Sequence, residues 1–183
     1  MQESKITIES VLALQEEAFN MKDLPWPCFT FPYAYEPYYK FLYLLCRKYQ
    51  PKVMVELGTW EGTASYHMAW GSPLGHLYTV DINAEAAKRL ESKMLMNTTF
   101  VLGDSREVAD KLPAEIDLLF IDTIHDYDLF KAEYNLYHDR VKQILLFDDI
   151  HFQTMGKVFE EVVRGNKVEL PKLHWSGFGA EVI

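Results

Sequence analysis

The sequence has no surplus of positive charge and few cysteines. It carries 18 Lys and Arg against 27 Asp and Glu, a formal net charge of −9 over 183 residues. So acidic a chain is poorly suited to a phosphate backbone, and no basic stripe offsets this, so we expect no nucleic-acid partner. The two cysteines, Cys28 and Cys46, lack the spacing of a metal site, and free thiols are typical of a reducing compartment.

The chain also lacks long apolar runs and internal repeats. No run approaches the roughly 20 residues that a membrane-spanning helix needs, and residues 1–10 are polar, unlike a signal peptide. We therefore expect a cytoplasmic protein with no membrane partner, folded as a single domain over residues 1–183. Within it, we expect residues 1–50 to form a helical and aromatic cap and residues 51–183 to form the ligand-binding core.

What is present after Pro51 is an alternation of short apolar runs and helical patterns. The runs are KVMVEL, HLYTVDI, TFVLGD, IDLLFID and QILLFDDI, each followed by a segment of expected helix, including residues 105–112 after the third run. Strands that alternate with helices form a parallel sheet covered on both faces. The tail has two short runs with no helix between them, which predicts an antiparallel pair. The predicted fold class is α/β: a doubly wound, mostly parallel, seven-stranded sheet.

The segment before this core is helical at its ends and rich in proline and aromatic residues in its middle. Apolar spacing predicts helices over residues 7–19 and 38–49, whereas four prolines exclude a helix or a central strand from residues 24–37. We expect an ordered loop there, which either packs against the sheet edge or forms a lid over the ligand. Tyr33 and Tyr35 are its expected substrate contacts.

An acidic residue closes each of the five predicted parallel strands. Ligands of doubly wound sheets bind beyond the carboxyl ends of the strands, at the switch in strand order. We therefore expect the site to be built around these acids, which in chain order are Glu56, Asp81, Asp104, Asp122 and the pair Asp148 and Asp149.

The loop after the first strand, ELGTWEG, indicates which cofactor the site accepts. Gly58 permits a tight turn and a close backbone approach. The spacing of Gly58 and Gly62 does not match the G-x-G-x-x-G pattern of dinucleotide folds, and Glu61 would face a pyrophosphate with negative charge. A cofactor with a positive centre and no phosphate fits better, and S-adenosylmethionine is such a molecule. Asp81 can accept hydrogen bonds from its ribose hydroxyls.

The segments VELGTWEG, LYTVDIN, VLGDS, FIDTIHDYD and LLFDDI occur in this order. Together they resemble class I S-adenosylmethionine-dependent methyltransferases, in particular the catechol O-methyltransferase-like branch and the small sugar and macrolide O-methyltransferases. The resemblance covers Lys52–Ile183. It implies that the first loop lies under the methionine part, the acid after the second strand binds ribose, and the residues after the third flank and cover adenine. The implied cofactor-binding residues are Glu56, Gly58, Thr59, Gly62, Asp81, Ile82, Asp104, Ser105, Arg106 and Asp122.

Three carboxylates are expected to meet where the fourth and fifth strands end. Asp122 ends one strand and Asp148 and Asp149 end its expected neighbour, so without a cation at least one of them should protonate. A divalent ion removes this conflict, and an all-oxygen site favours Mg²⁺ or Mn²⁺ over zinc. The resemblance places metal ligands at the same three positions. Asp149 departs from the catechol-type pattern, in which this ligand is usually asparagine.

His125 follows Asp122 by three residues and is the expected general base. A histidine side chain can take a hydroxyl proton near neutral pH, and the sugar-type enzymes that the sequence resembles carry a histidine at this position. His151, just beyond the acid pair, is a tentative substrate contact. Asp126 and Asp128 are expected to serve only the start of the next helix.

The predicted function is metal-assisted methylation of a hydroxyl on a small molecule, such as a sugar, a sugar-bearing metabolite or a catechol-like diol. One alternative is a metal-independent methyltransferase, in which the acid pair binds loop amides and His125 is structural. Another is a catalytically silent partner subunit that binds S-adenosylmethionine. Tyr127 and Lys131 have the spacing of a short-chain dehydrogenase pair, but they follow the wrong strand. The acceptor pocket is expected either to be open or to be completed by a second copy of the chain.

Overall fold

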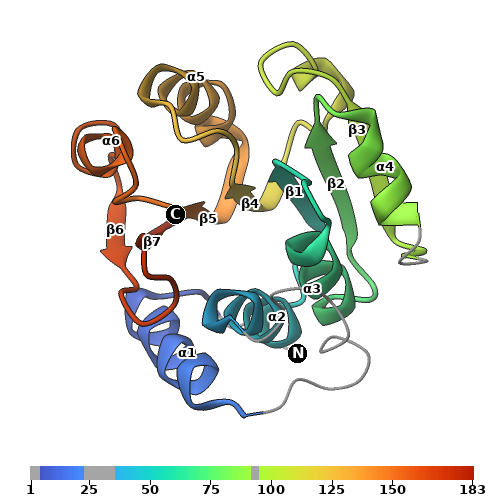
Figure 1. The fold of residues 1–183 in the computed structure, drawn as a ribbon. Helices are drawn as coiled ribbons and strands as arrows, with labels where there is room; N and C mark the ends of the chain where they lie inside the picture. Colours follow the sequence, from blue (N-terminus) through green and yellow to red (C-terminus); the bar gives the residue numbers. More distant parts are fainter. Residues whose placement is uncertain (1–4, 23–35, 92–94) are drawn as a thin grey trace.

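A seven-stranded sheet forms the centre of the computed structural model, which describes residues 5–22, 36–91 and 95–183 (Figure 1). Its strand order is β3-β2-β1-β4-β5-β7-β6, and β7 runs antiparallel to both of its neighbours. The predicted fold class and the antiparallel closing pair are therefore confirmed. The strands are β1 (Val53–Leu57), β2 (His76–Asp81), β3 (Thr98–Leu102), β4 (Ile116–Ile121), β5 (Val141–Asp148), β6 (Asn166–Glu169) and β7 (Phe178–Val182).

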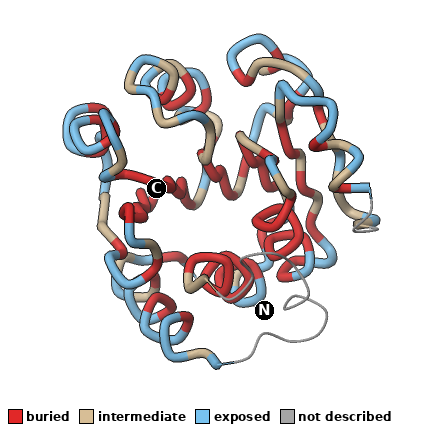
Figure 2. Tube along the Cα trace, viewed as in Figure 1, coloured by how far each residue is buried: buried red, intermediate tan, exposed pale blue. Residues whose placement is uncertain are grey.

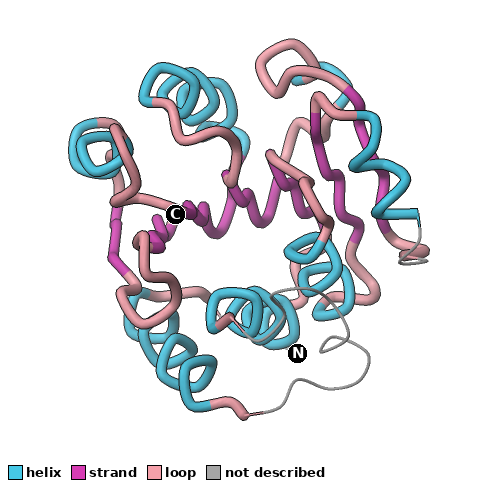
Figure 3. The backbone as a smooth tube through the Cα atoms, in the orientation of Figure 1, coloured by secondary structure: helices cyan, strands magenta, loops and turns pink. Residues whose placement is uncertain are grey.

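Helices cover both faces of the sheet (Figure 3). Helices α1, α2 and α3 pack on one face, α5 and α6 pack on the other, and α4 lies beside β3. Among the described residues, no helix is long and apolar enough to cross a membrane. The helices are α1 (Ile8–Asn20), α2 (Pro37–Tyr49), α3 (Thr63–Gly71), α4 (Ala84–Glu91), α5 (Tyr127–Tyr137) and α6 (Met155–Glu161), with 3₁₀ turns η2 (Ala109–Lys111) and η3 (His138–Arg140).

The central strands are apolar on both faces because both faces are covered. Phe120 and Leu146 point into the core beneath α1–α3, whereas Leu119 and Phe147 belong to the core beneath α5 and α6. All four side chains are fully buried, and the buried trace in Figure 2 follows these strands through the middle of the molecule. The two cores hold the carboxyl ends of the parallel strands along one edge of the sheet.

The two N-terminal helices lie where the apolar spacing predicts them. Thr7 caps α1 by accepting a hydrogen bond from the backbone N–H of Ser10, while the Ser10 hydroxyl accepts one from the backbone of Thr7. Helix α2 begins at Pro37, and proline is favoured in a first turn because its missing N–H needs no partner there. The loop between them, with Tyr33 and Tyr35, lies outside the described residues.

The helix expected over residues 105–112 is wrong. The structure has turns there and only the short η2. The turn begins with Asp104, whose backbone carbonyl accepts hydrogen bonds from the N–H groups of Glu107 and Val108 and whose side chain accepts one from Arg106. Acidic side chains that bond local backbone in this way favour turns over continuing helix.

Candidate active site

The loop between β1 and α3 passes directly against the end of β4. Gly58 has φ +99°, and a Cβ atom at this position would lie 1.9 Å from the carbonyl oxygen of Asp122. Only glycine fits this left-handed conformation and this contact. Since β1 and β4 are neighbours in space but not in sequence, this is the switch point of the sheet, where a ligand is expected.

Asp81 at the end of β2 holds the same loop through its side chain. Its Oδ2 atom accepts hydrogen bonds from the backbone N–H groups of Thr59 (3.1 Å) and Trp60 (2.9 Å). Its Oδ1 atom accepts one from Asn83 (2.8 Å). Asp81 therefore connects the ends of β1 and β2, and the next residue, Ile82, is 73% exposed at the same edge.

Glu56 is a fully buried acid beneath the loop. Its Oε2 atom accepts hydrogen bonds from the hydroxyls of Ser65 and Thr79. Its Oε1 atom has no hydrogen-bond partner among the described residues. Burial raises the pKa of Glu56 to about 7, even though both hydroxyls favour the charged form. An unpartnered buried carboxylate oxygen is costly and indicates a missing donor.

The residues after β3 divide between solvent and interior. Arg106 and Asp104 form an exposed pair, and the hydrogen bonds from Arg106 lower the pKa of Asp104 to about 2. Ser105 is instead buried, and its hydroxyl donates to Glu133 of α5 over 2.5 Å. Asp104 thus holds Arg106 at the surface, whereas Glu133 holds Ser105 in the interior.

Glu133 is a residue that the sequence reasoning missed. Its two carboxylate oxygens accept hydrogen bonds from Ser105 after β3 and from Thr123 after β4 (2.8 Å). The side chain is fully buried, and burial raises its pKa to about 7 despite these two hydroxyls. Glu133 therefore joins the loop on the Asp104 side of the site to the loop that carries Asp122.

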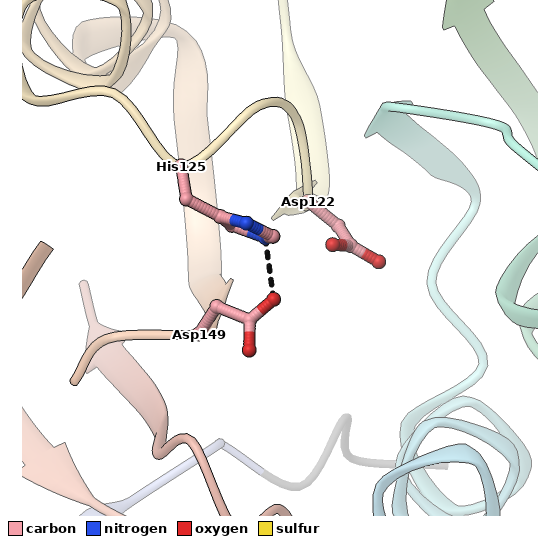
Figure 4. A group of neighbouring side chains, drawn as sticks. All are labelled: Asp122, His125 and Asp149. Atoms are coloured by element: carbon pink, nitrogen blue, oxygen red, sulfur yellow. Dashed lines mark ion pairs between the residues drawn. The ribbon is translucent and has the colours of Figure 1, made fainter. Parts of the chain in front are cut away.

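Asp122, His125 and Asp149 meet where β4 and β5 end (Figure 4). The Nε2 atom of His125 contacts Oδ2 of Asp149, and Asp122 lies beside these two residues at the end of the neighbouring strand. Asp149 has φ +55°, a left-handed conformation that turns the chain immediately after the strand. Each of the three residues offers one ligand atom within 4.8 Å of the others.

A second group shares Asp149 with the first and adds a histidine that was not predicted. His174, in the turn between β6 and β7, has its Nδ1 atom 2.8 Å from Oδ1 of Asp148 and 3.6 Å from Oδ1 of Asp149. The hydroxyl of Ser176 donates to the same Asp149 oxygen. The sequence signal was weak: a single histidine in the tail segment LHWSG, far along the chain from Asp148 and Asp149.

The crowding of these groups changes their pKa values. Burial raises the pKa of Asp122 well above its usual range, and the charges of Asp148 and Asp149 raise it further. Burial also raises the pKa of Asp148, although His174 opposes this. Burial alone would lower the pKa of His174, but the hydrogen bond and charge of Asp148 outweigh it and the pKa is raised. Within the described residues, no Lys or Arg pairs with any of these acids.

The structure brings together some of the expected metal, base and substrate residues but not all of them. The structure brings His125 and the three strand-end aspartates together at one edge of the sheet. His151 lies apart from them at the surface, where its half-exposed ring pairs with Glu169 over 3.2 Å. Tyr33 and Tyr35 lie outside the described residues.

The chain was compared with known families and structures. Residues 55–150 match the family model described as a methyltransferase domain. A methyltransferase of Podospora anserina, PaMTH1, bound to S-adenosylhomocysteine, has 13% identity and a TM-score of 0.67, over 98% of this chain and 89% of that one. The O-methyltransferase TomG of Streptomyces achromogenes, in complex with S-adenosylmethionine, has 19% identity and a TM-score of 0.63, over 100% and 92%.

An O-methyltransferase of Bacillus cereus in complex with S-adenosylhomocysteine has 16% identity and a TM-score of 0.63, over 96% of this chain and 89% of that one. At these identities the likeness is one of fold. A comparison with curated proteins found no match.

Proposed function

The chain belongs to the methyltransferase domain family and is a class I S-adenosylmethionine-dependent methyltransferase, and from this premise we propose that it methylates a hydroxyl of a small molecule with the help of a divalent metal ion. The observation that carries the proposal is the convergence of Asp122, Asp148 and Asp149 beside His125. The acceptor class remains that predicted from the sequence: a sugar, a sugar-bearing metabolite or a catechol-like diol.

The residues around the first loop suit S-adenosylmethionine. The Oε1 atom of Glu56 has no hydrogen-bond partner in the described part of the chain, and the ammonium group of the ligand can donate to it. Asp81 has already positioned the loop amides and retains lone pairs for ribose hydroxyls. PaMTH1, TomG and the Bacillus cereus enzyme were each solved with this cofactor or its demethylated product. Bound here, the cofactor supplies an electrophilic methyl group on a sulfonium.

The acid cluster suits a divalent cation. Three carboxylates lie close together, and burial and mutual repulsion raise the pKa values of Asp122 and Asp148. Among the described residues, the only basic side chains in contact with these carboxylates are histidines. Asp122, Asp148 and Asp149 would hold the ion, since hard divalent cations take carboxylate oxygens. When bound, the ion supplies positive charge that favours the ionised form of an acceptor hydroxyl.

His125 is proposed to accept the proton of that hydroxyl. Its side chain is about one third exposed, and the ring contacts Asp149 and packs at a steep angle against the Phe152 ring, with 5.0 Å between the ring centroids. A base that is held beside the acids and still open to solvent can reach an incoming substrate.

Helices α1 and α2, which pack on one sheet face, belong to the cap proposed for residues 1–50, over the core of residues 51–183.

The proposal is tested by following methyl transfer from S-adenosylmethionine to candidate sugars and catechols by mass spectrometry. We expect a chelator to abolish turnover and Mg²⁺ or Mn²⁺ to restore it. Asp122→Asn should lose the metal response and still bind S-adenosylmethionine. Full turnover in chelator would remove the metal from the proposal and leave the metal-independent enzyme. Cofactor binding without transfer to any acceptor, with metal present, would favour the silent partner subunit.

A further inference from the structure

His174 lies on the far side of Asp149 from His125, so that the Asp149 carboxylate sits between two imidazole rings. His125 contacts Oδ2 and His174 approaches Oδ1. The two histidines come from different parts of the fold, the loop after β4 and the turn before β7. Histidine ring nitrogens therefore lie on two sides of the acid cluster.

The Nδ1 atom of His174 is directed into the gap between the two neighbouring carboxylates. It is 2.8 Å from one oxygen of Asp148 and 3.6 Å from one oxygen of Asp149. These three atoms are close enough to share a single ion. In neutral imidazole one ring nitrogen carries a lone pair, and that nitrogen can bind a metal ion.

The ring of His174 is held in this position by packing. Its side chain is 14% exposed, and the ring of Tyr38 from α2 lies 4.8 Å away, centroid to centroid. The backbone carbonyl of His174 accepts a hydrogen bond from the N–H of Gly177 (3.1 Å), which closes the turn, and the chain then leaves the turn through Gly177 at φ +89°. A ligand that is fixed before the ion arrives loses little entropy on binding.

We propose that His174 is a nitrogen ligand of the metal site, completing a set with Asp148 and Asp149, and that the site therefore prefers a transition metal ion over Mg²⁺. This inference rests on the proposed metal-assisted function. Carboxylates and water suit Mg²⁺, whereas imidazole suits Fe²⁺, Co²⁺ and Zn²⁺. A set of carboxylates alone would favour Mg²⁺. Adding one imidazole ligand to that set raises the affinity for transition metal ions relative to the affinity for Mg²⁺.

The first experiment measures binding without turnover. Titration calorimetry on the metal-free protein gives the affinities for Mg²⁺ and Co²⁺, and hence their ratio. His174→Ala should lower Co²⁺ affinity by roughly 10–100-fold, the scale of losses around metal sites, and change Mg²⁺ affinity much less. His76→Ala is the matched control, because His76 lies at the opposite end of the sheet, where its ring bonds Thr99. An unchanged ratio in His174→Ala would overturn the inference.

A second measurement does not depend on how well the His174 variant folds. Pulsed electron paramagnetic resonance of bound Mn²⁺ detects nitrogen atoms that coordinate the ion directly. The measurement uses the His125→Ala variant, so that a nitrogen signal cannot come from His125. We expect a coupling of one histidine nitrogen, which changes when the histidines are labelled with ¹⁵N. Bound Mn²⁺ with no nitrogen coupling would overturn the role of His174 and leave the carboxylate metal site intact. Failure of the wild-type protein to bind any divalent ion would overturn both proposals.

Discussion

The Nε2 atom of His125 contacts the Oδ2 atom of Asp149, and this contact joins the loop after β4 to the end of β5. The contact places the proposed base against a proposed metal ligand. The metal ion and the base would then act on the same acceptor hydroxyl. Removing both should therefore lower the rate by less than the product of the two separate effects.

Replacing His125 should separate catalysis from cofactor binding. His125→Ala removes the proposed base and should lower kcat by roughly 10²–10⁴-fold, the usual contribution of general base catalysis, while the affinity for S-adenosylmethionine stays the same. Steady-state kinetics and calorimetry measure the two quantities. His76→Ala, at the opposite end of the sheet, should retain full activity. An unchanged kcat in His125→Ala would show that His125 is not the base.

Asp81 and Asp117 form a matched pair for testing the ribose site. Each carboxylate accepts hydrogen bonds from two consecutive backbone N–H groups, Asp81 from Thr59 and Trp60, Asp117 from Lys52 and Val53 at the other end of the strands. Asp81→Ala should weaken S-adenosylmethionine binding by about 1.5–3 kcal/mol, the scale for hydrogen bonds to a charged group. Asp117→Ala should leave it unchanged. Equal affinities in the two variants would show that the ribose lies elsewhere.

Gly58 should tolerate no side chain. Gly58→Ala would put a methyl group 1.9 Å from the carbonyl of Asp122 at a φ of +99°, so it should cost more than the roughly 1–3 kcal/mol of one strained residue. Gly156, in α6, offers the control because its nearest atom to an added Cβ is 4.0 Å away. Gly156→Ala should be neutral or stabilising by up to about 1 kcal/mol. Urea denaturation measures both changes, and similar stability of the two variants would refute the close approach of loop and strand.

Glu133 should make stability depend on pH. Its pKa in the folded protein is about 7, against an ordinary value of 4.5, so the folded state holds the proton more tightly. The stability from this group is present below about pH 4.5 and is lost as the pH rises through about 7. Glu133→Gln does not titrate, so its melting temperature relative to wild type should rise from pH 5 to pH 8. Each unit of pKa difference corresponds to about 1.4 kcal/mol.

Thermal unfolding at several pH values checks this prediction. Glu56 also has a raised pKa, but it is present in both proteins and cancels in the difference between them. A melting-temperature difference that does not vary with pH would mean that Glu133 keeps an ordinary pKa in the folded state. The same variant should retain cofactor binding at pH 6, where the wild-type side chain is mostly protonated.

The fold could be read from the sequence because its signals are local. A buried parallel strand is apolar on both faces and an amphipathic helix repeats its apolar positions, so each run from KVMVEL to QILLFDDI indicates its own element. The acids at the strand ends were equally visible, because parallel strands bring their carboxyl ends to one edge. The exception was residues 105–112, where the side chain and carbonyl of Asp104 form a turn in place of a helix.

Only the tertiary structure revealed His174 and Glu133. His174 reaches Asp148 across 26 residues of sequence because β7 runs back antiparallel along β5 and returns the preceding turn to the site. Glu133 meets Ser105 across 28 residues because α5 packs over the ends of two strands. Neither residue has a local pattern, since a lone histidine in a turn and a lone glutamate in a helix are usually solvated. Their burial and their partners depend on which segments pack together, and that is decided by strand order and layer packing.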